Sequence, residues 1–471
     1  MKNIKFLLII SAVIFYQPAI ALAQTITQSQ FLDQLKQRHP LFEKEKLSAE
    51  IEKEEQNSYL GAQDWNILSS ATFSHEEPAI AFAGPEKTDA FALSGGIERV
   101  FWNTGGKLGA SFTSSTAKIN PTFGFSMPFY QNEIAISYIH PLLKNKKGFL
   151  DRLQYNLKQF DIDFSEIQAI ENMEDFLALC ASQFLDWVYL TEQKKIIDER
   201  LRLSEEELDR AKRKRTANLV DQADVMRAED AVRIWKQNQV LVESQWNGLQ
   251  AKLAVLSQDE NINNLSPEFK LYQVKKLGSL KEDLLKLKND SRLIKVLSVQ
   301  LEQLELVRKS YQHTLQPDLS LVAQLNTKKL ETGFGKSLEM DKPDAVVGLH
   351  FSLPLRNSTA KSHITKTNLQ ISQLKKQVDE IILALTSELT NLNIQLTEMK
   401  NVLELNQEQI ESAKERTNEE LKLYNQGRGD LTFVILSRDN EQNAKLIYAQ
   451  NALTYHKLTI QYDALMDQLY K

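Results

Sequence analysis

Two long stretches of the chain repeat their apolar residues with the period of an α-helix. They cover residues 150–215 and 359–424, and each would be about 99 Å long as a continuous helix. In the second stretch the apolar positions alternate in steps of three and four, which is the spacing of a coiled-coil seam. The seam consists of Ile371, Leu374, Val378, Ile381, Leu385, Leu389, Leu392, Leu396, Met399 and Leu403. Two successive four-residue steps in its middle form an irregularity of the stutter type.

Shorter helical patterns flank the long ones, and strand patterns lie between them. The shorter helices are expected at 28–62, 222–257, 281–315 and 431–470. Apolar and polar residues alternate over 67–74, 133–141, 318–326 and 344–354, which predicts four amphipathic strands. Residues 89–117 alternate as well, around the turn at 103–106, and this pattern predicts a β-hairpin.

The order of elements is the same in residues 24–257 and 281–471, with a connector at 258–280. Each half reads helix, strands, long helix, tight turn and helix, so we expect an internal twofold repeat. Pro40 corresponds to Ser291 at the start of each half. Pro141 in IHPLL corresponds to Pro354 in SLPLR, where strand gives way to long helix. At the turns, NLVDQADVMRA from residue 218 corresponds to GRGDLTFVILS from residue 427.

The first half carries about 38 extra residues between its first two register points, as the offsets between corresponding residues fall from 251 to 213. The 89–117 hairpin with its flanks accounts for this difference. The hairpin could lengthen the existing strands or add strands to the wall of a sheet. We favour a lengthening at the outer end, away from the helices, which would place Asn103 at that end.

The first 23 residues have the pattern of a secretory signal peptide. Lys2 and Lys5 precede a short apolar run, and Ala21-Leu22-Ala23 is a small-x-small cleavage site. Its removal takes away two lysines and no acidic residue, which changes the net charge from −5 to −7. This negative charge argues against nucleic acid as a partner.

No later stretch is a continuous apolar run of the length that a transmembrane helix needs. If the mature chain is in a membrane, we expect it either to span the membrane as β-strands or to sit on its surface. Four strands cannot close a barrel alone, and open strand edges are not tolerated in lipid, so the strands need partners from other chains. The long helices have outer faces rich in Lys, Glu and Gln, and they are expected to project into water.

The chain resembles the TolC family of outer-membrane efflux proteins over its mature length. The resemblance rests on the HPLL and LPLR junctions, on the two tight turns, and on YNQGRGDLTFVIL, which is similar to the family's Tyr-x-x-Gly turn. It implies a mainly α fold with a transmembrane β part. This is a trimeric 12-stranded β-barrel in the outer membrane, continued by an α-helical coiled-coil tunnel in the periplasm.

The same resemblance implies a function. The homotrimer would conduct substrates passively from a periplasmic adaptor and an inner-membrane pump to the exterior, with no cofactor. The turns would be the periplasmic tips that dock the adaptor, with Asn218, Asp221, Gly427, Gly429 and Asp430. Asn218 stands where the family usually has glycine, and asparagine tolerates left-handed backbone angles, so we expect that the turn is kept.

Some members of the family carry two acids at the narrow periplasmic mouth. The matching positions after Gly427 are Phe433 and Leu436, and the first hairpin keeps one acid, Asp224. We therefore expect a mouth closed mainly by apolar contact. The basic run RAKRKR at 210–215 either binds a partner or complements the dipole at the end of its helix.

The sequence contains no motif for catalysis or for metal binding. Its seven histidines show no metal-ligand spacing, and no phosphate-binding glycine motif occurs. Two alternatives to a channel remain, a periplasmic coiled-coil adaptor and a coiled-coil structural protein. An adaptor would need one hairpin flanked by compact β-domains, whereas this sequence predicts two hairpins.

Overall fold

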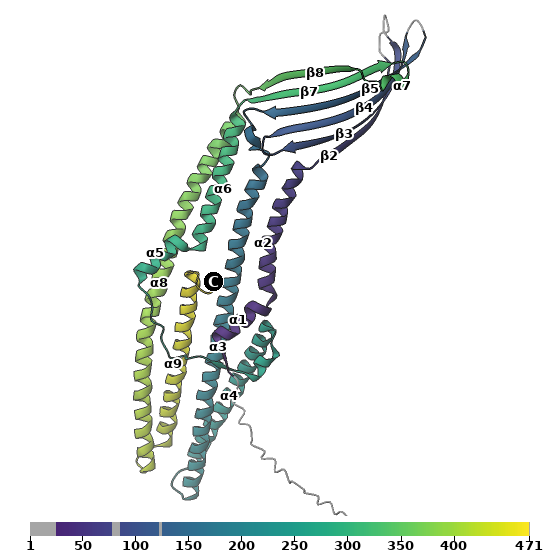
Figure 1. Ribbon diagram of the computed structural model, residues 1–471. Coiled ribbons are helices and arrows are strands. Elements are labelled where there is room, and N and C mark those ends of the chain that lie inside the picture. Colours follow the sequence, from purple (N-terminus) through teal and green to yellow (C-terminus); the bar gives the residue numbers. More distant parts are fainter. Residues whose placement is uncertain (1–24, 78–84, 122–124, 471) are drawn as a thin grey trace, which may run out of the picture.

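The computed structural model describes residues 25–77, 85–121 and 125–470, and the predicted signal peptide lies outside them. The described chain is elongated, with one large β-sheet at one end and a layer of long helices below it (Figure 1). This arrangement is the mainly α architecture with a separate β part that the sequence predicts.

The four helices that form the two long hairpins agree closely with the prediction. They are α3 (Leu153–Thr216), α4 (Gln222–Ser257), α8 (Ser358–Asn425) and α9 (Leu431–Leu465). Each hairpin reverses in a turn of five residues, and both turns lie at the end of the molecule opposite the sheet (Figure 1). The last helix is shorter than the predicted 431–470.

The two shorter helical segments are each broken, and the prediction of single helices over 28–62 and 281–315 is wrong. The first consists of α1 (Gln28–Arg38) and α2 (Pro40–Ser58), followed by the 3₁₀ turn η1 (Tyr59–Gln63), and the second of α5 (Leu280–Asp290) and α6 (Arg292–Leu315). The first break falls before Pro40, whose ring cannot continue a helix. The second falls at Ser291, the residue that the sequence comparison aligned with Pro40.

The sheet has six antiparallel strands in the order β2-β3-β4-β5-β7-β8. The first four are β2 (Asn66–Glu76), β3 (Pro85–Phe101), β4 (Gly106–Pro121) and β5 (Met127–Pro141). The last two are β7 (Asp318–Glu331) and β8 (Lys342–Ser352), and the short helix α7 (Phe334–Ser337) lies between them. The described chain therefore forms one sheet of six strands. Within the described residues, its edge strands, β2 and β8, have no partner on their outer sides.

This sheet corrects two expectations about the 89–117 hairpin. Its strands β3 and β4 lie between β2 and β5 along their whole length. The hairpin therefore adds two strands to the sheet and does not lengthen the existing ones. The expectation of four strands per chain is wrong. The turn of the hairpin lies at the helical end of the sheet, because β3 runs toward that end. The expectation that Asn103 marks the outer end is therefore wrong as well.

The helices form one layer whose membership changes halfway along the molecule. Near the sheet the order is α2-α3-α6-α8, and toward the tips it is α4-α3-α9-α8. The helix α8 thus exchanges its partner α6 for α9 (Figure 1). The seam residues Ile371 and Leu374 are buried above the exchange, Leu389, Leu392 and Leu396 are buried below it, and the stutter between them is only half-buried. The stutter therefore lies where the helix changes partner.

The predicted connector is folded across the middle of the helical layer. It contains the 3₁₀ turn η3 (Glu260–Asn264) and the strand β6 (Ser266–Glu268), which pairs in parallel with β1 (Thr25–Thr27). Further along, His456 on α9 donates a hydrogen bond to the carbonyl oxygen of Leu271 at 2.9 Å, and Tyr455 donates one to that of Lys275 at 2.9 Å. The largest buried cluster of the described chain lies at this level.

Candidate channel surfaces

The six-stranded sheet has one apolar face and one polar face. Opposed residues of neighbouring strands share a face, so the pairing register assigns each side chain to one of them. The apolar face carries twelve large side chains that are all exposed. They are Ile67, Phe73, Phe91, Leu93, Ile97, Phe112, Ile134, Ile136, Leu325, Val347, Leu349 and Phe351.

Small and polar residues dominate the opposite face. One row crosses all six strands, and every residue in it can hydrogen-bond with water. The row is Ser70, Ser94, Thr113, Glu133, Lys328 and Lys342. An apolar patch of this size is rare on a protein surface that faces water, whereas lipid on one side and water on the other match the two faces.

The two turns at the tips have the same backbone structure. Asn218 and Gly427 both adopt left-handed angles, with φ of 53° and 74°. In the first turn the N–H of Leu219 donates to the carbonyl of Lys214 at 2.9 Å. In the second turn the N–H of Arg428 donates to that of Leu423 at 3.0 Å. Asn218 therefore keeps the turn, as its tolerance of left-handed angles predicts.

Gly429 serves the second turn in a way that the sequence did not indicate. Of the two glycines in this turn, only Gly427 has a positive φ angle. At Gly429 a Cβ atom would lie 2.9 Å from the backbone nitrogen of Tyr424. A side chain here would force the backbone of this turn to shift, so glycine allows the close approach.

The acids beside the turns cap the helices that follow. The carboxylate of Asp430 accepts a hydrogen bond from the N–H of Thr432 at 2.7 Å. Hydrogen bonds with the side chain and the backbone of Thr432 hold the pKa of Asp430 below its ordinary value. In the first turn the N–H of Asp221 donates to Asp224 at 3.4 Å, and Arg227 pairs with Asp224 at 2.6 Å. These carboxylates are engaged by their own turns within one chain.

The two residues expected at the mouth lie on an exposed side of α9. Phe433 is 53% exposed and Leu436 is 47% exposed, while their neighbours Leu431 and Val434 are buried against α3, α4 and α8. Phe433 and Leu436 therefore do not pack between the helices of their own chain. Their side of α9 is free for water or for another chain.

Part of the basic run at 210–215 joins the two tips. Lys214 donates to the carbonyl oxygen of Tyr424 at 3.0 Å, and its ammonium lies 3.5 Å from the centre of the Tyr424 ring. Arg210 reaches the side chain of Asn425 at 3.4 Å. Burial lowers the pKa of Lys214. Two of the basic residues thus bind the second hairpin, while Arg213 pairs with Asp209 on its own helix.

The proline junctions lie at the helical end of the sheet. Pro141 is the last residue of β5 and pairs with Ser320 of β7, and Pro354 follows the end of β8 by two residues. The backbone N–H of Leu142, the residue after Pro141, still donates to the carbonyl oxygen of Leu319 at 2.8 Å. The long helix α3 begins only at Leu153, after the 3₁₀ turn η2 (Lys146–Gly148).

Solved structures of similar shape are outer-membrane proteins. The chain is similar to the CmeC outer membrane channel of Campylobacter jejuni, with a TM-score of 0.66 and 12% identity over 94% of this chain and 86% of that one. It is also similar to the MtrE outer membrane channel of Neisseria gonorrhoeae, with 0.63 and 14% over 94% and 89%. For the outer membrane protein VceC of Vibrio cholerae the values are 0.64 and 10% over 94% and 95%.

This chain has the outer-membrane channel fold. The likeness extends over nearly the whole described chain, so it confirms the mainly α fold with a separate β part that the resemblance to the TolC family implies. No family model matches the sequence, and no curated protein matches it either. The adaptor alternative does not fit, since an adaptor would have one hairpin between compact β-domains.

The described part of the channel fold offers no metal centre. In it, no group of three or more His, Cys, Asp or Glu residues could hold a metal ion. None of the described helices is long and apolar enough to cross a lipid bilayer.

A buried ionic network that the sequence analysis missed joins the two hairpins of the channel fold. Arg200 on α3 is fully buried and pairs with Asp439 on α9 at 2.8 Å and with Glu207 at 3.5 Å. Glu207 is 2% exposed and also pairs with Arg438 on α9 at 2.6 Å. Trp235 on α4 donates to Asp439 at 3.2 Å. Burial raises the pKa of Glu207, and Arg200 and Arg438 oppose this rise.

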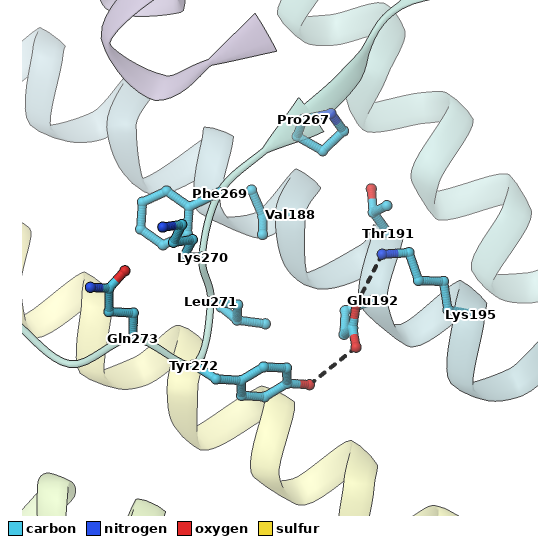
Figure 2. Close-up of a pocket in the computed structure, with 10 residues that line it drawn as sticks. All are labelled: Val188, Thr191, Glu192, Lys195, Pro267, Phe269, Lys270, Leu271, Tyr272 and Gln273. Carbon is cyan, nitrogen blue, oxygen red and sulfur yellow. Dashed lines mark hydrogen bonds and ion pairs between the residues drawn. The ribbon is translucent and has the colours of Figure 1, made fainter. Parts of the chain in front are cut away.

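A groove of about 520 Å³ lies beside the connector of the channel fold (Figure 2). One side is the connector from Pro267 to Gln273, and the other is α3 from Val188 to Lys195. Glu192 on α3 accepts hydrogen bonds from Tyr272 and from Lys195, both at 3.3 Å. The Tyr272 ring also stacks on Tyr448 of α9. These contacts position the connector, and the groove lies away from both ends of the channel fold.

Proposed function

We propose that this protein is an outer-membrane channel of a tripartite efflux or type I secretion system. The sheet spans the outer membrane and the helical layer stands in the periplasm. Three copies form one conduit that carries substrates from a periplasmic adaptor and an inner-membrane pump to the exterior. The pump supplies the energy, and the channel itself performs no chemical reaction.

The two-faced sheet carries this proposal. Its apolar face contains twelve exposed large side chains, and covering it with lipid removes them from water, which lowers the free energy by roughly 25 cal/mol per Å². Its polar face, rich in serine and threonine, borders a water-filled lumen. A protein that works in water alone would gain nothing from an apolar face of this extent.

The open sides of one chain support an assembly of copies. The sheet ends at two unpaired edges, and the helices at the sides of the layer, α4 and α8, expose large apolar residues. These residues are Met226, Ile234, Val240, Leu241 and Val255 on α4, and Leu369, Leu383, Ile394 and Leu405 on α8. A neighbouring copy would cover both the edges and these side chains. The number three comes from the resemblance to the TolC family.

The tips and the mouth of the conduit lie at the ends of the hairpins. The turns around Asn218, Asp221, Gly427, Gly429 and Asp430 dock the adaptor. Phe433 and Leu436, exposed in one chain, meet their copies around the axis and close the mouth by apolar contact. Asp224 and Asp430 lie nearby, but each is already bound by its own turn.

The purified protein in mild detergent tests the channel. We expect particles of three times the mature mass with mostly helical circular dichroism, and discrete ion conductance after reconstitution in planar bilayers. A monomer that stays in solution without detergent would contradict the proposal. An assembly that inserts without conducting would contradict it too.

The mouth has its own test in Phe433→Asp. Three carboxylates at an apolar constriction should attract water and cations, so the variant should conduct better and acquire block by divalent cations. Phe433→Leu keeps the site apolar and should resemble the wild type. If Phe433→Asp leaves both conductance and divalent block unchanged, Phe433 does not face the mouth.

A further inference from the structure

The β3–β4 hairpin has the surface of a membrane wall along its length. On β3 the large residues Phe91, Leu93 and Ile97 are exposed on the apolar face of the sheet, in register with Phe73, Ala71 and Ile67 of β2. Between them, Ala92, Ser94 and Gly96 continue the polar face and are half-buried. A hairpin that stood outside the membrane would expose this apolar face to water.

The turn of the hairpin is fixed to the helical part of the protein. Trp102 is 5% exposed, and its ring packs edge-on against Tyr155 of α3 with centroids 5.6 Å apart. Arg99 donates to the carbonyl oxygen of Gln63 in η1 at 2.7 Å. A Cβ at Gly148 would collide with the carbonyl oxygen of Trp102, so that turn lies directly against η2. The hairpin therefore starts at the level where the other strands meet their helices.

The hairpin adds two strands between β2, which follows α2 and η1, and β5, which precedes α3. Strands about 4.8 Å apart and tilted by about 40° occupy about 6.3 Å of circumference each, so six cover about 38 Å and four about 25 Å. The six-stranded sheet of one chain is therefore about 1.5 times as wide as a four-stranded one.

The open edges β2 and β8 suit each other as neighbours in a ring. Both have 11 residues, and β2 runs away from the helices while β8 runs toward them, so they would pair antiparallel. Both carry large residues on the same face of the sheet, Ile67 and Phe73 on β2 and Leu349 and Phe351 on β8. Pairing of two copies would continue both the apolar face and the polar face without a break.

We propose that β2 of each copy pairs with β8 of a second copy, and that three copies close an 18-stranded wall. The inference rests on the proposed function and changes its pore. The wall has about 1.5 times the circumference of a 12-stranded barrel, since circumference grows with strand number. The hairpin lines the added lumen with Ala92, Ser94, Gly96, Ser111 and Thr113.

Two adjacent residues of β3 test where the hairpin stands. Ser94→Cys and Leu93→Cys are placed in reconstituted trimers and treated with a charged, water-soluble thiol reagent. We expect Ser94→Cys to react from the lumen and Leu93→Cys to react only after denaturation, because lipid covers it. The native Cys180 is fully buried and serves as background in the unmodified protein. Reaction of both engineered thiols, or of neither, overturns the proposal.

The strand count can also be observed directly by electron cryomicroscopy of the protein in lipid nanodiscs. A ring of 18 strands with β2 beside β8 supports the inference. Conducting trimers with a 12-stranded ring and the hairpin outside it overturn the inference and leave the proposed function intact. Particles with no membrane-embedded ring and no conductance overturn both.

Discussion

The two halves of the chain agree in their helices and differ in their strands. Each half contributes a broken helix near the sheet, α1–α2 or α5–α6, and a long hairpin. The two tip turns share their left-handed residue and their hydrogen bonds. The first half, however, contributes four strands to the sheet, and the second contributes two.

The difference shows which insertion this architecture accepts. A hairpin leaves and re-enters the sheet at the same end, so β2 and β5 keep their directions and remain above α2 and α3. An insertion of one strand would reverse every later strand and place a helix on the wrong side. A pair of strands widens the wall and leaves the helices unchanged.

The contact between the halves depends on charge, and Glu207→Ala should break it. The substitution leaves Arg438 buried without its carboxylate and leaves Arg200 with Asp439 as its remaining partner, which costs about 3 kcal/mol in the free energy of unfolding. The neighbouring Glu206→Ala is the control, because Glu206 is exposed and pairs only with Arg202 on its own helix. The thermal unfolding midpoint in detergent measures both variants. If the two variants unfold at the same temperature, the buried network does not hold the two halves together.

The added strands of the first half should depend on Trp102. Trp102→Ala leaves a cavity between the hairpin turn and α3 and should cost about 3 kcal/mol, at the lower end for a buried tryptophan. Asn103→Ala changes an exposed neighbour and should have little effect. Denaturant unfolding in detergent gives the difference. A Trp102→Ala protein as stable as the wild type would mean that the turn is not anchored.

The tips sharpen the comparison at Gly427 and Asn218. Gly427→Val places a β-branched residue at a φ of 74°, which costs about 1–3 kcal/mol and should displace the turn. We expect export to be abolished while trimers remain in the outer membrane. Gly427→Asn copies the residue of the first turn and should retain export. Normal export from Gly427→Val would count against a docking role for this turn.

The smallest effect is expected at the helix cap Asp430. Its pKa is lowered by the hydrogen bonds from Thr432, so its contribution is complete above the ordinary value of about 3.9 and is lost as the pH falls through the lower folded value. Asp430→Ala should cost about 1 kcal/mol at neutral pH. Asp430→Asn keeps an acceptor without a titration, so its stability should lose this acid dependence. The free energy of unfolding is measured from pH 2 to 7 for the wild type and the two variants. If all three lose stability equally as the pH falls, the Asp430 cap does not contribute to it.

The local periodicity predicted the long helices well. The bounds of α3, α4 and α8 differ from the predicted ones by at most three residues, because the apolar stripes and the glycine and asparagine turns are local signals. The register match of Pro40 with Ser291 marks both breaks, but the apolar period continues across them and predicts continuous helices. Because such a break keeps the apolar residues in phase, the helical period is unchanged across it and does not predict it.

The site residues were predicted unevenly. The turns follow from Asn218 and Gly427, whose backbone preferences are local. The network of Arg200, Glu207 and Arg438 joins residues more than 200 positions apart. The close approach at Gly429 involves Tyr424, only five positions away, but it depends on the path that the folded turn takes. One signal could have indicated the network, namely a charged residue on the side of a helix that faces its neighbours. The sequence does not show, however, which helices are neighbours.

The sequence by itself determined the element types, the two-faced strands and the left-handed turns, because each depends on spacing within a few residues. The tertiary structure decided how many strands stand side by side. An alternating hairpin has the same pattern whether it lengthens two strands or adds two, since both arrangements bury the same face. Only the pairing of β2 with β3 and of β4 with β5, together with the packing of Trp102 against α3, distinguishes a wider wall from a taller one.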